Sequence, residues 1–561
     1  MFTIDSTHFL SLVCAFLFAI LAHLSFSGFF KNTYYKMISF ALFPVLLMAS
    51  SLIFPQFILQ GFAYLIFLLG LILFFYKTPQ HLLHFKNLKN LKNQNSKKEK
   101  LIFFFIIIYL LSFFMSSTEL GGVGLIQDAL VYHIEGPKEW ALYLNGAKFN
   151  PNNPISYTTS YYDYYYYFLF LIVKPFFLAT SKLATTQYEF LSYTFLLTAQ
   201  IFTAVLGYVY IPYLILRMAS NFGHYKYLIL IFVFSIRDIT WSWPLPKNDA
   251  FPFFCFLLAL EIFYHNYILK KNNPSVKWLL LSATLIGIGC GSKLTNSYVV
   301  IFSLLFYALF YFKDAMSRVR EIKLTKSIFI ACAGMLLGVS IFLIRNWIQT
   351  GNPFYPIAKF GFPDVYLTKY AARPELYILP GTWDMALTKI KLHIISQPQL
   401  WLLLVAAFIA KIRLLPLFYI FSVTYMAKQT GPMYSFRMTS ILLILLLIMI
   451  IMLVQRIYQL QDIKKKKIFS ILLIFFVLIY GKLQVEKMVK IPYRTYFKPI
   501  ATLLESNLHQ WDELLKNNLE NRENPHYVYW TSENIFPYFS RYPVISTLDS
   551  VPEKRVEYFK E

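Results

Sequence analysis

A short polar segment, QDALVYHIEGPKEWALYLNG (127–146), lies between two strongly apolar stretches and holds several side chains that could do chemistry. Four of them recur with helical periodicity and share one face of a predicted helix: Asp128, Tyr132, Glu135 and Glu139. An amphipathic helix whose acids face water would have the same pattern. The elements around the segment therefore decide which interpretation is favoured.

More polar clusters stand at the ends of predicted membrane helices, at the same membrane depth as this segment. They are Lys247-Asn248-Asp249, Lys293, Arg345-Asn346 and Arg437. Each cation alone is typical of an interfacial anchor that reaches to water, and Asp249 alone is typical of an acid at a helix start. Together, carboxylates and cations at one depth suit a site that deprotonates a hydroxyl group while it stabilises a departing phosphate.

The composition predicts a membrane protein that crosses the bilayer many times. Of 561 residues, 57% are hydrophobic and only 14% charged, and the mean hydropathy is +0.52, which a soluble domain could not keep off its surface. The net charge of +24 comes mostly from short basic runs between apolar segments, so it reports topology and predicts no nucleic-acid partner. The four cysteines lie in apolar stretches without metal-ligand spacing, so neither a disulfide framework nor a metal cluster is predicted.

Apolar runs of membrane length predict about fourteen spans in an otherwise all-α chain. The loop 77–100 has seven lysines and one glutamate, which places it in the cytoplasm by the positive-inside rule. Three later basic loops then fall on the same side, and both termini lie outside. The expected spans are near 9–29, 37–54, 57–76, 101–116, 188–214, 225–240, 250–268, 277–291, 295–312, 326–345, 396–411, 414–428, 437–455 and 467–483.

The chain is expected to have four parts. Residues 1–116 form N-terminal membrane helices with the basic loop 77–100, and 117–187 form a long outer loop with interfacial helices. Residues 188–484 form the helical core, with 346–395 as another outer loop. Residues 485–561 form a small outer α/β domain, with a helix near 497–520 and strands at YVYW (527–530) and PVIS (543–546).

The aromatic stretch 161–183 could be mistaken for a further span. Lys174 and Pro175 interrupt it, and counting it would turn every later basic loop outward. It is therefore predicted to be a helix that lies in the membrane interface. The seven tyrosines between Tyr157 and Tyr167 are expected to anchor it at headgroup level, with stacking on sugar rings as the alternative.

The order of these motifs resembles that of the membrane-embedded glycosyltransferases of the GT-C fold, which take sugars from polyprenyl-phosphate donors at the outer face of the membrane. GIGCGSK (287–293) is similar to a helix of transferases that modify lipid A and of protein mannosyltransferases, and RNWIQTGNPFYP (345–356) to a motif common in bacterial members. An early outer-loop Asp in a D-x-x-x-Y-H context, followed by K-x-W and a glycine, carries most of the likeness: Asp128, Tyr132, His133, Lys138, Trp140 and Gly146.

The resemblance implies a GT-C-like fold and a role for each matching residue. Asp128 would be the catalytic base of an inverting transfer, and Asp249 a second acid that positions Lys293 or the acceptor. Donor phosphate would bind Lys293, Arg345 and Arg437, in that order of preference. His133 would contact phosphate or a sugar hydroxyl, or make a structural hydrogen bond. The supporting residues implied are Tyr132, His133, Lys138, Lys247 and Asn346.

The partners implied are a polyprenyl-phosphate sugar, a glycan, lipid or protein acceptor, and the bilayer of a bacterial inner membrane with periplasmic termini. The outer loop has no clear D-x-D pair, so the resemblance implies no cofactor and no metal ligands, although a divalent metal stays an open alternative. The chain also departs from many relatives in having three extra helices before the one that leads into the Asp128 loop.

Two other functions remain alternatives. A flippase or transporter of lipid-linked glycans would also have many helices and a cationic cavity, but transporters tend to carry charges near the midplane and to repeat their halves. A polymerase or ligase of surface glycans would generally rely on arginine and histidine loops without an early aspartate. Indifference to the loss of Asp128 would favour this second alternative.

Overall fold

The computed structural model of the chain divides into two compact units. Unit 1 is Met1–Val205, Pro244–Lys247 and Gln484–Glu561, and unit 2 is Leu206–Trp243 and Asn248–Leu483. The four-part division expected from the sequence stays a prediction. The residues described are 6–30, 32–86, 109, 113, 133–149, 160–180, 185–236, 243–268, 276–294, 296–297, 300, 324–355, 382–396, 398–409, 414–430, 440–459, 471, 478–479, 482, 528–530 and 544–546.

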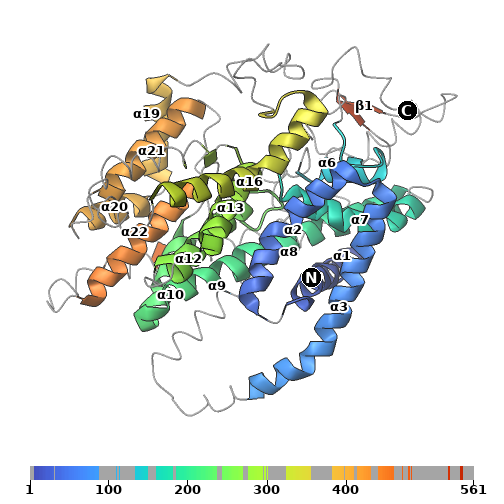
Figure 1. Ribbon diagram of the computed structural model, residues 1–561, viewed down its shortest axis with the longest axis horizontal. Coiled ribbons are helices and arrows are strands. Elements are labelled where there is room, and N and C mark those ends of the chain that lie inside the picture. The colour runs from blue at the N-terminus through green and yellow to red at the C-terminus, as the bar shows by residue number, and fades with distance from the viewer. Residues whose placement is uncertain are drawn as a thin grey trace, which may run out of the picture. The chain divides into compact units, whose positions relative to one another are not determined.

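Unit 1 is built from helices of the N-terminal third of the chain (Figure 1). Small residues let α1 and α3 touch closely, because a Cβ atom at Gly28 or Gly70 would overlap the backbone of the other helix. Asn32 caps the start of α2, where its side chain accepts a hydrogen bond from the Tyr34 amide at 2.8 Å. The helices are α1 (Ser6–Gly28), α2 (Thr33–Ile53), α3 (Gln56–Lys86), α6 (Glu135–Leu142), α7 (Asp163–Thr180) and α8 (Thr185–Val205).

Two short strands complete the described part of unit 1. The strand β1 (Val528–Trp530) pairs in parallel with β2 (Val544–Ser546), with Tyr529 opposite Ile545. Both strands lie where the sequence predicts them, whereas the helix expected near 497–520 lies outside the described residues. The placement of this segment on the outer side of the membrane stays a prediction.

Unit 2 contains the remaining helices (Figure 1). The π-helical turn η4 (Leu206–Tyr210) precedes α9, and the π-helical turn η6 (Tyr264–Ile268) follows α12. The 3₁₀ turn η5 (Ser220–Tyr225) follows α9. The helices are α9 (Ile211–Met218), α10 (Lys226–Ser235), α12 (Ala250–Phe263), α13 (Val276–Ser292), α16 (Leu324–Thr350), α19 (Trp383–Ser396), α20 (Pro398–Ile409), α21 (Leu414–Thr430) and α22 (Ser440–Gln459).

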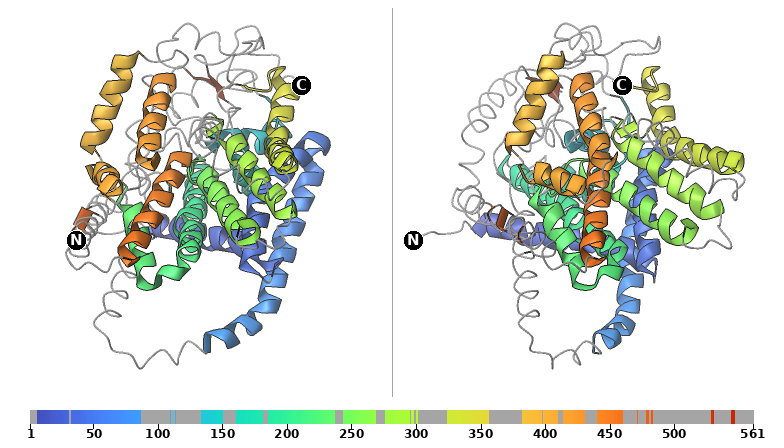
Figure 2. Two further views of the ribbon diagram at one scale, coloured as in Figure 1. Left: turned by 60° about the vertical axis from the view of Figure 1, so that its left-hand side comes forward. Right: turned by 90° about the vertical axis from the view of Figure 1, so that its left-hand side faces the viewer.

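Glycines bring the backbones of α13 and α16 into contact (Figures 1 and 2). A Cβ atom at Gly334 would overlap Ala283 and Leu280, and one at Gly338 would overlap Thr284 and Ile288. Residues later in α13 therefore contact residues later in α16, which shows that the two helices run parallel. The small-residue helix predicted from GIGCGSK is one half of this interface.

Five described helices are long and apolar enough to cross a membrane, which identifies an integral membrane protein. They are Phe9–Gly28, Thr33–Ile53, Gln56–Lys77, Phe190–Met218 and Lys326–Thr350. Shorter apolar helices occur at four other predicted positions: Ala250–Asn266, Val276–Ser292, Pro416–Tyr425 and Leu442–Arg456. The total of about fourteen stays a prediction, and α19 lies within the stretch predicted to be the loop 346–395.

Candidate functional site

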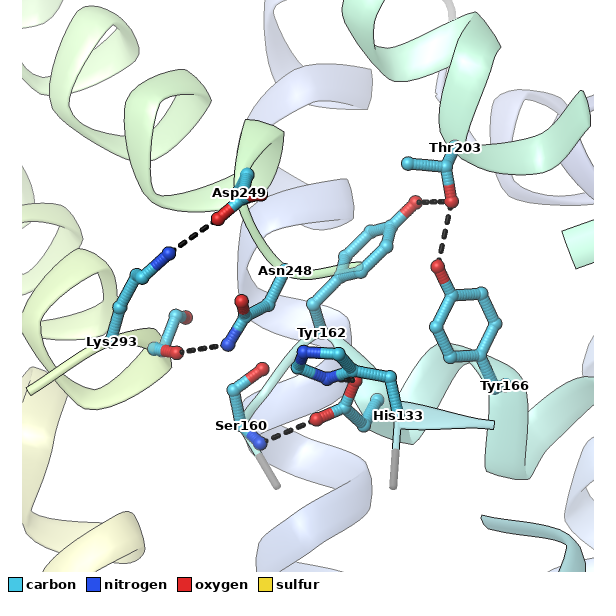
Figure 3. A network of polar contacts seen from close by, with 10 residues as sticks. His133, Ser160, Tyr162, Tyr166, Thr203, Asn248, Asp249 and Lys293 are labelled. Atoms are coloured by element: carbon cyan, nitrogen blue, oxygen red, sulfur yellow. Dashed lines mark hydrogen bonds and ion pairs between the residues drawn. The ribbon is translucent and has the colours of Figure 1, made fainter. Parts of the chain in front are cut away.

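A buried histidine and aspartate pair lies in unit 1, at the start of α7 (Figure 3). His133 Nδ1 lies 2.9 Å from Asp163 Oδ1, so this nitrogen carries the proton that the carboxylate accepts. The backbone amide of Ser160 donates to Asp163 Oδ2 at 2.6 Å. Both oxygens of a fully buried carboxylate are therefore occupied, and the orientation of the His133 ring is fixed. The sequence pattern singles out His133 but not Asp163. The signal that could have found Asp163 is an acid in the first turn of a helix.

The acids of α6 are buried inside unit 1. Glu135 and Glu139 are 1% and 3% exposed, which contradicts the amphipathic alternative in which they face water. Lys138 is fully buried beside them, with its Nζ 3.6 Å from Glu135 Oε2 and 5.8 Å from the ring centroids of both Tyr143 and Tyr188. The described neighbours of Lys138 are thus Glu135 and two aromatic rings.

Burial raises the pKa of Glu135 to about 8. Removal from water is the largest cause, the charge of Lys138 opposes it, and Glu139 adds to it. Among the described residues, Glu135 Oε2 has no hydrogen-bond partner. The raised pKa favours the protonated form of Glu135 in the folded protein relative to the unfolded chain.

This raised pKa predicts a pH-dependent stability. Because the folded protein holds the Glu135 proton up to about pH 8, the stabilisation is present at pH 4.5 and is lost as the pH rises through 8. We expect the Tm of the wild type in nanodiscs to fall between these pH values more steeply than that of Glu135→Gln, whose amide does not titrate. Parallel Tm curves for the two proteins across this range would show that Glu135 does not bind the extra proton.

The tyrosine run at the start of α7 is buried, which corrects the prediction that it anchors the helix at the membrane interface. Tyr162 donates to Thr203 Oγ1 at 3.1 Å, Tyr166 OH lies 2.7 Å from the same oxygen, and Thr203 donates onward to Ala199 O at 2.9 Å (Figure 3). These rings can be buried because their hydroxyl groups find hydrogen-bond partners inside the protein. A run of tyrosines in the sequence is the same whether the rings are buried or lie at the interface. The fully buried members are Tyr161, Tyr162, Tyr164, Tyr165, Tyr166 and Tyr167.

In unit 2, two consecutive polar residues join the start of α12 to the end of α13 (Figure 3). Lys293 Nζ donates a short hydrogen bond to Asp249 Oδ1 within an ion pair. Asn248 Nδ2 donates to Ser292 O at 2.9 Å. The second acid and the first phosphate-binding candidate predicted from the sequence are therefore in contact. Asp249 precedes the first residue of α12, where the helix dipole favours its negative charge.

The RNWIQTGNPFYP motif ends α16 and folds back on it. Asn346 Nδ2 lies 3.3 Å from both Pro353 O and Tyr355 O, and Thr350 Oγ1 donates to Asn346 O at 2.7 Å. Gly351 has a φ of 72°, the left-handed conformation common just after a helix. Asn346 therefore holds the turn that follows α16, which gives this predicted supporting residue a structural role.

Arg345 is fully buried near the C-terminal end of α16, and Lys293 directly follows the last residue of α13. In the parallel pair, Ala283 meets Gly334 and Gly287 meets Gly338, an offset of 51 residues (334 − 283 and 338 − 287). If the same offset is applied to Lys293, the corresponding position of α16 is 344, which precedes Arg345 in the sequence. The helix contact thus places the two cations at the same end of the α13 and α16 pair.

The remaining predicted site residues are placed in part. Lys247 is 3% exposed and belongs to unit 1. Asp128, Tyr132 and Arg437 lie outside the described residues, so their roles stay predictions. Among the described residues, no group of three or more His, Cys, Asp or Glu could hold a metal ion.

Comparison with known proteins adds one distant likeness. No known family profile matches the chain, and no curated protein matches it. Among solved structures, the chain is similar to ArnT from Cupriavidus metallidurans bound to undecaprenyl phosphate, with 11% sequence identity and a TM-score of 0.44. The likeness covers 80% of this chain and 86% of that chain. At this distance it assigns no function, so we base the proposed function on the residues and their contacts.

Proposed function

We propose that the chain is a GT-C-type membrane glycosyltransferase that moves a sugar from a polyprenyl-phosphate donor to an acceptor hydroxyl at the outer face of a bacterial inner membrane. The observation that carries the proposal is the placement of Lys293 and Arg345 at one end of the parallel helix pair, with Asp249 bonded to Lys293. Two cations with one carboxylate leave a net positive charge, which suits a phosphate that gains negative charge as its sugar departs.

The two cations have different tasks in this mechanism. Arginine can hold a phosphate through two parallel N–H donors, whereas lysine acts as a point charge. Asp249 keeps the Lys293 ammonium in place before the donor arrives, and the phosphate then shares that ammonium with Asp249. In a site of low dielectric constant, these charges act on the leaving group more strongly than they would in water.

The transfer itself needs a base, and the sequence offers Asp128. The acceptor oxygen attacks the anomeric carbon as its proton passes to the Asp128 carboxylate, and the bond between that carbon and the phosphate oxygen breaks. The bonding electrons leave with the polyprenyl phosphate, and the configuration of the sugar inverts. Arg437 would add a third cation to the leaving group. The termini would lie in the periplasm and the lysine-rich loops in the cytoplasm.

The function is tested with purified wild-type protein in nanodiscs and radiolabelled polyprenyl-phosphate sugars. A bacterial membrane extract supplies glycan, lipid and protein acceptors, and nucleotide sugars serve as the control donors. We expect label to move to an acceptor only from the lipid-linked donors. Movement of intact donor between the leaflets of liposomes, without any transfer, would overturn the proposal in favour of a transporter.

A further inference from the structure

Gln56, the first residue of α3, contacts the end of α6 from another helix. Its side-chain Nε2 donates to Trp140 O at 3.0 Å and to Ala141 O at 2.8 Å. Both carbonyls lie in the last turn of α6, which ends at Leu142 and where carbonyl groups have no partner within the helix. Trp140 O also accepts the Gly146 amide at 3.0 Å. The buried amide of Gln56 therefore caps the C-terminal end of α6.

The oxygen of the Gln56 side-chain amide accepts a hydrogen bond from α7. Lys174 Nζ donates to Gln56 Oε1 at 3.1 Å, which gives a partner to the lysine that interrupts this apolar helix. Through Gln56, a positive charge stands near the negative end of the α6 dipole. The ring of Trp140, whose carbonyl Gln56 binds, packs against Tyr164 and Tyr167 of α7 at centroid distances of 5.3 and 5.8 Å.

Further hydrogen bonds attach α2 and α3 to α7. Tyr64 OH of α3 donates to Ile172 O at 3.3 Å, and Ser51 of α2 donates to Tyr164 OH at 3.4 Å. Tyr165 OH donates a short bond to Phe40 O of α2. Hydrogen bonds therefore attach α7 to α2 and α3 at several points. Through Gln56, α6 is attached to this group of helices.

We propose that Gln56 is a positioning residue that fixes α6, the helix that follows Asp128 in the chain, to the N-terminal helices. Its importance for catalysis rests on the proposed transferase function. The segment carries Asp128, His133 and Lys138, and α6 is its described helical part. The start of α3 thus adds side-chain hydrogen bonds to the backbone turn that ends α6.

The test compares Gln56→Leu with Gln60→Leu. Leucine has a similar size but no amide, so Gln56→Leu leaves two buried carbonyls and Lys174 without these bonds. Gln60 is the matched control, because its Nε2 donates to Tyr64 OH of its own helix at 3.1 Å. Gln56→Glu keeps the size and a partner for Lys174 but cannot donate to the two carbonyls.

Hydrogen exchange of the amides of residues 133–149 is measured on each protein in nanodiscs. We expect exchange at least about tenfold faster in Gln56→Leu and Gln56→Glu, and unchanged exchange in Gln60→Leu, because lost caps allow a helix end to open. Lys174→Met, with a smaller expected increase, replaces Gln56→Leu if that variant does not fold. Unchanged exchange in the Gln56 variants would overturn the proposal.

Sugar transfer provides the second readout. We expect kcat to fall about tenfold in Gln56→Leu, with the KM for the donor nearly unchanged, because a misplaced base slows the chemical step more than binding. Faster exchange with unchanged kcat would overturn the positioning role. If the wild type transfers no sugar, the transferase function fails, and the exchange measurement still decides whether Gln56 fixes α6.

Discussion

Asp128→Asn is expected to lower sugar transfer by about 1000-fold while donor binding remains, because asparagine keeps the size of the side chain and loses the proton acceptor. The measurement is the initial rate of label transfer at saturating donor, with donor affinity measured separately by competition. Glu139→Gln is the matched control, since it removes a carboxylate from the same predicted helix face without a role in the reaction.

Equal transfer by the wild type and Asp128→Asn would contradict the assignment of the base. Transfer that survives this change but is lost in an Arg437 variant would favour a polymerase or ligase mechanism. Loss in Glu139→Gln to the same degree would show that any missing acid in this segment disturbs the fold. The comparison thus separates chemistry from structure.

Lys293→Met is expected to lower both stability and transfer. The Asp249 side chain is 6% exposed, so removal of the lysine leaves a buried charge, at a cost of about 3 kcal/mol in the free energy of unfolding. Asp249→Asn should be milder, because Lys293 is the more exposed partner of the pair, with 16% of its side chain accessible against 6%. The double variant Asp249→Asn with Lys293→Met has no unpaired charge and should regain most of the stability.

Sugar transfer should not return with stability in that double variant, because the phosphate has lost a cation. The four proteins are compared by Tm in nanodiscs and by transfer rate at several donor concentrations, with the coupling read as a double-mutant cycle. Recovery of both Tm and transfer in the double variant would identify the pair as structural only. If all three variants lose both thermal stability and sugar transfer, the result would show no role for Lys293 in donor binding apart from its role in stability.

The positions of most described helices could be predicted from the sequence, because apolar run length alone determines where a chain can span a bilayer. The helix α19 was missed because TWDMALTKIKLHIIS mixes charged and apolar residues and lacks such a run. Strands β1 and β2 were found from two short runs rich in β-branched and aromatic residues.

The candidate site was predicted less completely. Asp249 and Lys293 were singled out and do form a pair, yet their contact depends on the packing of α12 with α13. Asp163 was missed because its partner, His133, is thirty residues away in the sequence. The interfacial position predicted for Tyr165 was wrong, and the alternative in which Glu135 faces water is excluded by its burial. Periodicity defines a face of a helix but not what covers that face.

The glycine contacts between α13 and α16 have an energetic consequence for the charges at the end of this helix pair. Because the two backbones touch at Gly287 and Gly338, sliding of one helix along the other is blocked by main-chain atoms. One residue of slip would displace Arg345 by about 1.5 Å relative to Lys293. The register of the two helices that lead to these cations is therefore fixed by main-chain contacts. Helices in a fixed register need little rearrangement during the reaction, which is the property of a preorganised electrostatic environment.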